Sequence, residues 1–464
     1  MGAETLAGVS LGRAGLPPAL LELCQRLSGA GQRAWLVGGC VRDSLRAQLI
    51  GPAQPGSWQA KDWDLATDAT PQQVMRLFRR VIPTGVDHGT VTVLLTGMQV
   101  EVTTLRTEVG YADGRRPDQV DFVSSIEEDL ARRDFTVNAI AFEPQTEALI
   151  DPFGGLEDLR SRRLRAVGQA ARRFAEDGLR VLRAARFVAT LEFELDPATA
   201  SAIRPSLDTY RQVSAERIRD EWNKALLARE PSRAFVVMHE HGLLEVSAPE
   251  LWALAAQRAG AEDRLSLALR RTDRCAPQLE LRLAALLREL GPNAASSAQL
   301  ADALLVRLRY SNAERKAVGR AVRGRELPLD PEPSDAVLRR WLRDVGVDGY
   351  ADLCRLERAD VLARGQAPGA DVSASSARLS QLDRLEQRAA AELERKPPLS
   401  LSQLAIDGKS LMTELGVPPG PEIGKLLAAL LDQVLEQPQL NTRDSLLERA
   451  RRLRAETAAA ATDR

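Results

Sequence analysis

The chain has 464 residues, which is enough for about two to four domains. Its 63 Lys and Arg against 64 Asp and Glu give a net charge of -1, which argues against a general nucleic-acid coat protein. The four cysteines and three histidines show no metal-like spacing, which argues against a structural zinc site and a disulfide framework. Hydrophobic residues make up 44% but aromatics only 4%, so Leu, Ala and Val must build most of the core, a composition that favours helices.

Targeting signals and membrane spans are not expected. The N-terminus lacks a basic stretch followed by an apolar core, and no run of about 18 apolar residues occurs. We therefore expect a protein of a reducing, cytoplasmic setting with no membrane partner. The sequence does not indicate an oligomeric state.

The first third of the chain mixes short strands and helices. Residues 1–16 are rich in Gly and Ala and are expected to be flexible, and residues 51–60 are turn-rich. A hairpin is predicted from two β-branched runs that flank Thr96-Gly97-Met98. The other elements predicted here, in chain order, are a helix at 18–27, a strand at 34–37, a helix from 41, a strand at 62–65, a helix at 70–80 with Thr70 as its N-cap, strands at 90–95 and 99–105, a polar loop at 107–118 and a short strand at 120–123.

From residue 126 the apolar periodicity is helical, apart from residues 149–153 and a turn at Gly154-Gly155, and after residue 170 it is almost entirely so. Residues 364–375 are the best candidate for a linker. The pattern therefore predicts a small α/β head followed by a long helical arm.

A glycine turn joins the first predicted strand to the next helix. Gly38 and Gly39 would let backbone N–H groups approach a phosphate chain, and the helix N-terminus favours negative charge. Arg42, one turn later, can pair with a phosphate oxygen.

Two aspartates follow on the second predicted strand. Asp62 and Asp64 are two residues apart, so both side chains face one way and can hold two Mg²⁺ ions. In a nucleotidyl-transfer reaction, one ion would activate the attacking 3′-hydroxyl and the other would stabilise the departing pyrophosphate. Glu101, between two valines of a later strand, is a candidate third metal ligand. A lone Asp-x-Asp is usually a solvated turn. The metal site is favoured because the glycine turn, the two aspartates and the later strand acid Glu101 follow one another in this order.

Two further segments carry candidate nucleotide contacts. In the segment 132–139, Arg133 could hold a phosphate, Asp134 a ribose hydroxyl, and Asn138 could support the sugar. In isolation this segment could equally be a charged helix start with apolar residues in the core.

Beyond Asp177, arginines at 180, 183 and 186 step by three along a predicted helix, which is also typical of a solvated helix face. The functional alternative is a protein template for a base. An Asp177 carboxylate would accept from the amine of cytosine or adenine, and Arg180 would donate to the adjacent ring nitrogen. Uracil and guanine present the opposite pattern and would leave buried polar groups unpaired.

Together these segments resemble the class II CCA-adding tRNA nucleotidyltransferase and bacterial poly(A) polymerase family. The resemblance is carried by Gly-Gly-x-Val-Arg-Asp at 38–43, Asp-x-Asp at 62–64, Arg-Arg-Asp-Phe-Thr-x-Asn-Ala at 132–139, Asp-Pro-Phe-Gly-Gly at 151–155 and Glu-Asp-x-x-Arg at 176–180, with weaker similarity at 214–218 and 419–424. It implies a polymerase-β-like nucleotidyltransferase sheet, metal ligands at Asp62 and Asp64, and a tRNA acceptor end, CTP and ATP as substrates. Its nucleotide contacts would fall on Gly39, Arg42, Arg133, Asp177, Arg180, Arg183 and Arg186.

The resemblance also implies a domain order and an activity. We expect a head at 17–160, a helical neck at 161–230, a body at 231–363, the linker at 364–375 and a tail at 376–464. The implied activity is template-independent addition of CCA to tRNA. CC-only or A-only addition, poly(A) synthesis and an inactive tRNA-binding protein stay open. A full-length loop at 106–117, where the family switches from C to A, favours complete CCA.

The chain departs from the family pattern at three points. Trp63 stands where the family has a smaller aliphatic residue, and the connection at 46–60 is longer than usual by about ten residues. No histidine follows His241, so the phosphohydrolase domain of some relatives is not expected.

Overall fold

The structure is a computed structural model that describes residues 11–51, 58, 60, 62–109, 119–123, 125–260, 262–324, 327–329, 333–347, 349–367 and 369–462. The predicted flexible N-terminus, the inserted connection and the 106–117 loop lie partly outside these residues. The chain divides into two compact units, residues 1–252 and 253–464. The expected domain boundaries at 160, 230 and 363 remain predictions.

A seven-stranded sheet forms the centre of the first unit, with the strand order β3-β4-β5-β2-β1-β8-β9. Its neighbours pair antiparallel except β2 and β5, which are parallel. The sheet strands are β1 (Ala34–Val37), β2 (Trp63–Thr67), β3 (Val81–Gly85), β4 (Thr90–Leu95), β5 (Met98–Thr104), β8 (Ala141–Glu143) and β9 (Ala148–Ile150), and a separate ribbon is formed by β6 (Arg106–Val109) and β7 (Gln119–Phe122).

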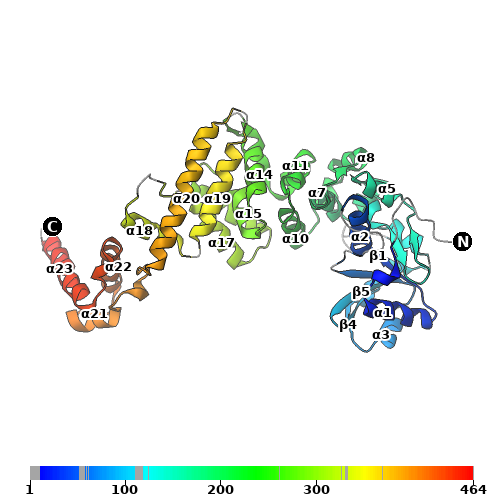
Figure 1. The fold of residues 1–464 in the computed structure, drawn as a ribbon, viewed down its shortest axis with the longest axis horizontal. Helices are drawn as coiled ribbons and strands as arrows, with labels where there is room; N and C mark the ends of the chain where they lie inside the picture. Colours follow the sequence, from blue (N-terminus) through cyan, green and yellow to red (C-terminus); the bar gives the residue numbers. More distant parts are fainter. Residues whose placement is uncertain are drawn as a thin grey trace. The chain divides into compact units, whose positions relative to one another are not determined.

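Helices flank this sheet and continue after it in the chain (Figure 1). They are α1 (Pro18–Gly29), α2 (Gly39–Ile50), α3 (Pro71–Leu77), α4 (Ile126–Ala131), α5 (Gly155–Arg160), α6 (Ala170–Glu176), α7 (Leu179–Leu191), α8 (Pro197–Ser201), α9 (Leu207–Tyr210), α10 (Ala215–Leu226), α11 (Ser232–Glu240), α12 (Leu243–Ser247) and α13 (Pro249–Trp252), with short 3-10 turns at Arg13–Gly15, Val86–His88, Thr136–Asn138 and Arg204–Ser206. Both α10 and α11 pack against the amphipathic helix α7.

Local sequence explains several of these boundaries. Thr70 caps α3 by accepting from the backbone N–H of Gln73, with Pro71 in the first turn, as predicted. Gly97 has a φ of 78°, which allows the predicted tight turn between β4 and β5. The helix expected to reach Arg80 instead ends at Leu77, because the β-branched run that follows forms β3 at the edge of the sheet, where Pro83 is tolerated.

The second unit is almost entirely helical. Its elements are α14 (Arg264–Arg274), α15 (Leu279–Leu287), α16 (Ala294–Arg307), α17 (Asn312–Arg323), α18 (Asp335–Val345), α19 (Tyr350–Arg364), α20 (Val372–Glu394), α21 (Gly408–Leu415), α22 (Pro421–Glu436) and α23 (Arg443–Thr462), with 3-10 turns at Ala253–Ala256, Leu401–Gln403 and Pro438–Leu440 and a two-residue β pair, β12 (Arg258–Ala259) with β13 (Glu262–Asp263). An apolar core rich in Leu joins α18 to α23. The fold class predicted from the sequence, an α/β head with mainly helical units after it, is confirmed.

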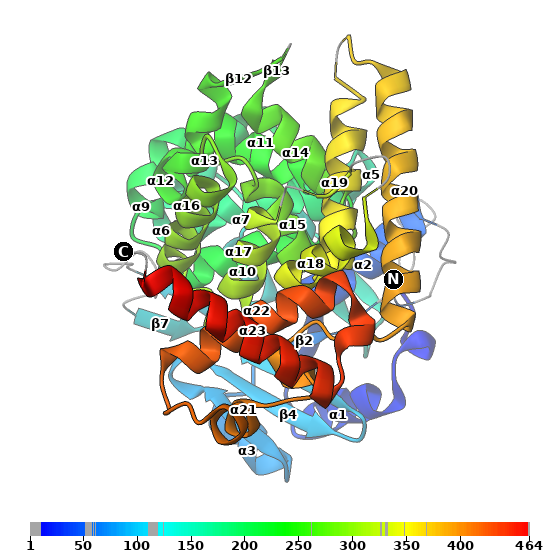
Figure 2. The same cartoon turned by 90° about the vertical axis from the view of Figure 1, so that its left-hand side faces the viewer.

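The segment expected as a linker, 364–375, has a different role in this unit. Arg364 ends α19 and Val372 begins α20, and the two helices pack side by side in both views (Figures 1 and 2). The described residues of this stretch, 365–367 and 369–371, therefore connect two helices that pack on each other rather than two separate domains. Its composition matches that of a spacer, which is why the sequence alone did not separate the two.

Candidate active site

The turn between β1 and α2 has the geometry that a phosphate cradle needs. Gly38 adopts a φ of 72°, and a Cβ there would lie 3.2 Å from Arg133 Nη1 and 3.3 Å from Asp64 Oδ2. Gly38 therefore serves both the backbone turn and the close approach of two charged groups. Arg42 Nε and Nη2 donate to Asp43, and Arg42 Nη1 donates to Asn138 Oδ1 at 2.7 Å. The first turn of α2 thus presents backbone N–H groups beside a fixed guanidinium.

Two of the predicted acids stand on neighbouring strands. Asp64 on β2 and Glu101 on β5 are direct partners in the parallel ladder, so their side chains leave the same face of the sheet. Asp62 lies one residue before β2 and is exposed, rather than inside the strand as predicted. It is close enough for its charge to act on Asp64.

The pKa of both carboxyl groups in this pair is raised. Burial raises the pKa of Asp64, Arg133 acts against that shift, and the charge of Asp62 adds to it. Burial also raises the pKa of Glu101, and its neighbour Asp64 raises it further. A bound divalent cation would reverse both shifts, so the donor set has the chemistry of a cation site. Among the described residues, however, no three Asp, Glu, His or Cys side chains already stand close enough together to hold a metal.

The segment 132–139 forms a hydrogen-bonded block beside these acids. Asn138 Nδ2 donates to Asp134 Oδ1 at 2.9 Å, and Arg183 Nε on α7 donates to Asp134 Oδ2 at 2.7 Å. Burial opposes the charge on Asp134, but Arg183 and the hydrogen bond from Asn138 outweigh it and hold the pKa of this carboxyl far below its usual range. Asp134 is thus a permanent anion that aligns Arg183. Arg133 donates weakly to Asp129 Oδ2 at 3.4 Å, and its Nε is buried without a hydrogen-bond partner.

Asp177 and Arg180 flank the start of α7. Asp177 Oδ1 accepts from the backbone N–H of Leu179, and Oδ2 accepts from Arg217 Nη2 at 2.7 Å. Arg180 donates to Glu176 at 2.7 Å and to the backbone oxygens of Arg173 and Arg132. The carboxylate and the guanidinium predicted to read a base are therefore both held by neighbours, with lone pairs and N–H groups left over.

A pocket of about 390 Å³ in the first unit brings most of these groups together. Its lining contains the predicted residues Gly38, Gly39, Arg42, Asp64, Glu101, Arg133, Asp134, Asn138, Asp177, Arg180 and Arg183. The volume suits a nucleotide-sized ligand, since ligand pockets span about 300–1,000 Å³.

Two predicted residues are not part of this lining. Asp62 stands outside it, before β2. Arg186 is buried and paired through Nε with Glu221 of α10, with its guanidinium 3.7 Å from the Phe187 ring centroid. Its expected contact with a nucleotide stays a prediction, because the packing of α10 on α7 already supplies Arg186 with the carboxylate of Glu221 as a partner.

Other lining residues were not singled out from the sequence. They include Arg106, Arg132, Phe187 and Arg217, together with the threonines at 90 and 103. Arg217 fixes Asp177 and has a buried Nη1 without a hydrogen-bond partner. The motif at 214–218 was the available signal, but its spacing says nothing about which earlier carboxylate it meets.

Three family models match the chain in order. They are described as the poly A polymerase head domain at residues 34–165, a probable RNA and SrmB-binding site of polymerase A at 192–254, and a putative tRNA nucleotidyltransferase domain 2 at 369–450. The CCA-adding enzyme of Lactobacillus delbrueckii subsp. bulgaricus is 37% identical over 92% of this chain and 96% of its own length. That of Limosilactobacillus reuteri is 32% identical over 95% and 98%.

Among solved structures, the Bacillus stearothermophilus CCA-adding enzyme in complex with CTP matches with a TM-score of 0.72 and 30% identity, over 95% of this chain and all of that one. The Thermotoga maritima CCA-adding enzyme complexed with tRNA matches in fold, with a TM-score of 0.57 and 17% identity over 94% of this chain and 96% of that one.

The sheet, the glycine turn and the first family model define a nucleotidyltransferase with a poly(A) polymerase-type head. The identity with full-length relatives is more specific, and this chain belongs to the CCA-adding enzyme family. Within the part of the chain that the structure describes, every helix is too short or too polar to cross a membrane.

Proposed function

We propose that this protein adds CCA to the 3′ end of tRNA from CTP and ATP, without a nucleic-acid template and with release of pyrophosphate. One observation carries the proposal. The groups that would hold a triphosphate, Gly39 and Arg42, line the same pocket as Asp177 and Arg180, which would read the base. A single pocket that serves both ends of a nucleotide suits an enzyme whose template is protein.

Asp62 and Asp64, with Glu101 beside Asp64, are the residues that would hold Mg²⁺. The bound ions would supply charge neutralisation at the triphosphate and a more acidic 3′-hydroxyl. The chain's own groups position the substrate. The N–H groups at the start of α2 and the Arg42 guanidinium would bind the phosphates, and Asn138 and Asp134, already joined by a hydrogen bond, are suited to the ribose.

Base selection would rest on fixed hydrogen-bond polarity. The Asp177 carboxylate can only accept and the Arg180 guanidinium can only donate, so cytosine and adenine satisfy both groups. Uracil or guanine would place a carbonyl against Asp177 and an N–H against Arg180, leaving buried groups unpaired. Because Arg217 and Glu176 restrain the pair, neither side chain can easily rotate to accept the wrong base.

The product is tested with tRNA substrates that end at the discriminator base, at -CC and at -CCA, each incubated with one nucleotide at a time. Full CCA addition predicts C incorporation on the first substrate, A on the second and none on the third. C incorporation on the first substrate without A incorporation on the second would indicate a CC-adding enzyme. Addition of A alone, or long A tails on the third substrate, would indicate an A-adding enzyme or a poly(A) polymerase.

The metal role is tested with Asp62→Ala in the same assay, against Asp87→Ala as an exposed control outside the pocket lining. We expect Mg²⁺-dependent incorporation to be lost only in Asp62→Ala. Wild-type activity in that variant would refute the catalytic role, and a wild-type chain that binds tRNA without incorporating any nucleotide would identify an inactive relative. The proposed tRNA substrate also favours the cytoplasm as the location of this protein.

A further inference from the structure

β2, the strand that carries Asp64, begins one residue after Asp62. The ladder between β2 and β5 starts with Trp63 opposite Val100, and the ladder between β2 and β1 ends with Asp64 opposite Val37. Asp62 therefore stands beyond the last cross-strand pair. Hydrogen bonding in the sheet fixes Asp64 but not Asp62, although a shared cation needs both carboxylates in one place.

Trp63, between the two aspartates, lies on the opposite face of the sheet. Successive side chains of a strand alternate, so Trp63 shares its face with Leu65, which is paired with Leu36 of β1. Leu36 is also paired with Phe142 of β8, which places Phe142 on that same face. Trp63 is 8% exposed, so this large side chain is buried behind the acids and not beside them.

The side chain that covers Trp63 comes from the lengthened connection at 46–60. The Trp58 ring centroid is 5.4 Å from that of Trp63 and 5.4 Å from that of Phe142. Its Nε1 donates to the backbone oxygen of Gly12 at 3.0 Å. Trp58 thus spans from β2 to β8 across β1 and is itself held by the segment that precedes α1. These contacts stiffen the first residue of β2, which is the residue joined to Asp62.

We propose that Trp58 is a positioning residue for the metal site, acting through Trp63 to fix Asp62 beside Asp64. The inference rests on the proposed function, since it assigns the two aspartates to a metal. It gives the lengthened connection and the unusual Trp63 one shared role. Loss of the Trp58 ring would loosen Asp62 while Asp177 and Arg180, held by their own neighbours on α6 and α10, keep their places.

The test uses the full chain with Trp58→Leu and the conservative variant Trp58→Phe. Mn²⁺ binding to the nucleotide-free protein is measured by electron paramagnetic resonance. We expect the Mn²⁺ dissociation constant to rise about three- to tenfold in Trp58→Leu, the size expected for one lost aromatic contact, and to stay within about twofold in Trp58→Phe. The Mg²⁺ concentration for half-maximal C incorporation should shift by the same factor, whereas KM for CTP at saturating Mg²⁺ should not.

Trp252→Leu is the matched control, because Trp252 is 40% exposed and does not line the pocket. Unchanged Mn²⁺ binding in Trp58→Leu would overturn the proposal, as would an equal loss of CTP and metal affinity, which marks a general structural defect. If Trp58→Leu does not fold, Trp58→Met, which keeps bulk without the ring, makes the same comparison. A wild-type chain that binds Mn²⁺ but adds no nucleotide would refute the proposed function while leaving the Mn²⁺ comparison valid.

Discussion

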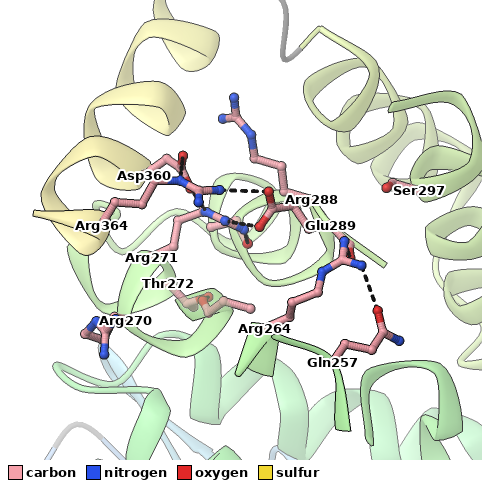
Figure 3. A network of polar contacts seen from close by, with 12 residues as sticks. Gln257, Arg264, Arg270, Arg271, Thr272, Arg288, Glu289, Ser297, Asp360 and Arg364 are labelled. Atoms are coloured by element: carbon pink, nitrogen blue, oxygen red, sulfur yellow. Dashed lines mark hydrogen bonds and ion pairs between the residues drawn. The ribbon is translucent and has the colours of Figure 1, made fainter. Parts of the chain in front are cut away.

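Arginine–carboxylate clusters occur in both units, and they differ in how their charges are paired. In the first unit, arginines line the pocket, and both Arg133 Nε and Arg217 Nη1 are buried without a hydrogen-bond partner. In the second unit, Arg271 and Arg364 share the same two carboxylates, Asp360 and Glu289 (Figure 3). We call the charged groups that line the pocket the open cluster, because some of its donor groups are unused. We call Arg271, Arg364, Asp360 and Glu289 the closed cluster, because these four groups pair with one another.

Charge balance explains the difference. Arg271 of α14 is fully buried, and together with Arg364 it neutralises Asp360 of α19 and Glu289, which follows the end of α15. Burial opposes ionisation of Asp360, but Arg271 and Arg364 hold its pKa at about 2. The pocket of the first unit instead places Asp64 and Glu101 side by side with raised pKa values. The four charges of Arg271, Arg364, Asp360 and Glu289 balance one another, whereas the pocket has both unpaired donors and crowded acids, which a nucleotide and its cations would relieve.

The largest expected effect is on catalysis, with Asp64→Asn. The amide keeps the shape of the side chain but cannot replace the charge of a metal ligand, so we expect C incorporation on tRNA to fall about 10³-fold or more. The measurement is single-turnover incorporation at saturating CTP and Mg²⁺. A fall of less than about tenfold would show that the open cluster does not hold the catalytic metal.

The next effect is on stability, with Arg271→Ala in the closed cluster. Removing one partner of a buried network leaves charge unpaired, and we expect the free energy of unfolding to drop by about 3 kcal/mol, measured by urea denaturation. Activity per folded molecule should stay unchanged. Arg315→Ala, which breaks a partly exposed surface pair with Asp302, is the control and should cause a much smaller change. Loss of activity without loss of stability in Arg271→Ala would erase the distinction between the clusters.

A smaller effect is expected for Arg217→Met in the open cluster. Asp177 would lose its side-chain partner and gain rotational freedom, so misincorporation of UTP relative to CTP should rise about tenfold, with little change in Mg²⁺ dependence. Asp177→Ala and Arg180→Ala should lose selectivity more completely. If the ratio of UTP to CTP incorporation is unaltered in all three variants, the protein-template role is wrong.

The smallest effect is again with Asp64→Asn, now on the stability of the metal-free protein. The pKa of Asp64 is raised on folding, so the native state binds its proton more tightly than the unfolded chain, and stability falls as pH rises from the unfolded pKa through the raised one. At neutral pH the neutral amide should therefore raise the melting temperature, by roughly 1–4 °C. Scans in EDTA at pH 5 and pH 8 measure this. A variant that melts below wild type at pH 8 would contradict the inferred crowding.

Much of this was predictable from local pattern. The glycine turn, the β4–β5 hairpin and the start of α3 depend on residues close in sequence, and all are found as expected. The resemblance located the family for the same reason, because its motifs are short and ordered.

What the sequence did not predict depends on long-range packing. The three arginines of α7 look equivalent at a spacing of three, yet Arg180 and Arg183 line the pocket while Arg186 turns to Glu221, 35 residues later. Arg217 and Asp177, which pair with each other, are 40 residues apart in the sequence. The ribbon strand β6 occupies 106–109, where a polar loop was expected, since its polar composition hid the pairing with β7. Periodicity finds a helix but not its neighbours.

The Trp58–Trp63 contact also has an evolutionary consequence. With a large indole behind the acidic strand, deletion of the longer connection would uncover an apolar side chain, and a small residue at 63 would leave a void under Trp58. Either change alone would therefore be harmful, whereas both together would remove the uncovered side chain and the void at once. The longer connection and Trp63 thus depend on each other. A protein that has both is expected to keep both, because loss of either one alone is harmful.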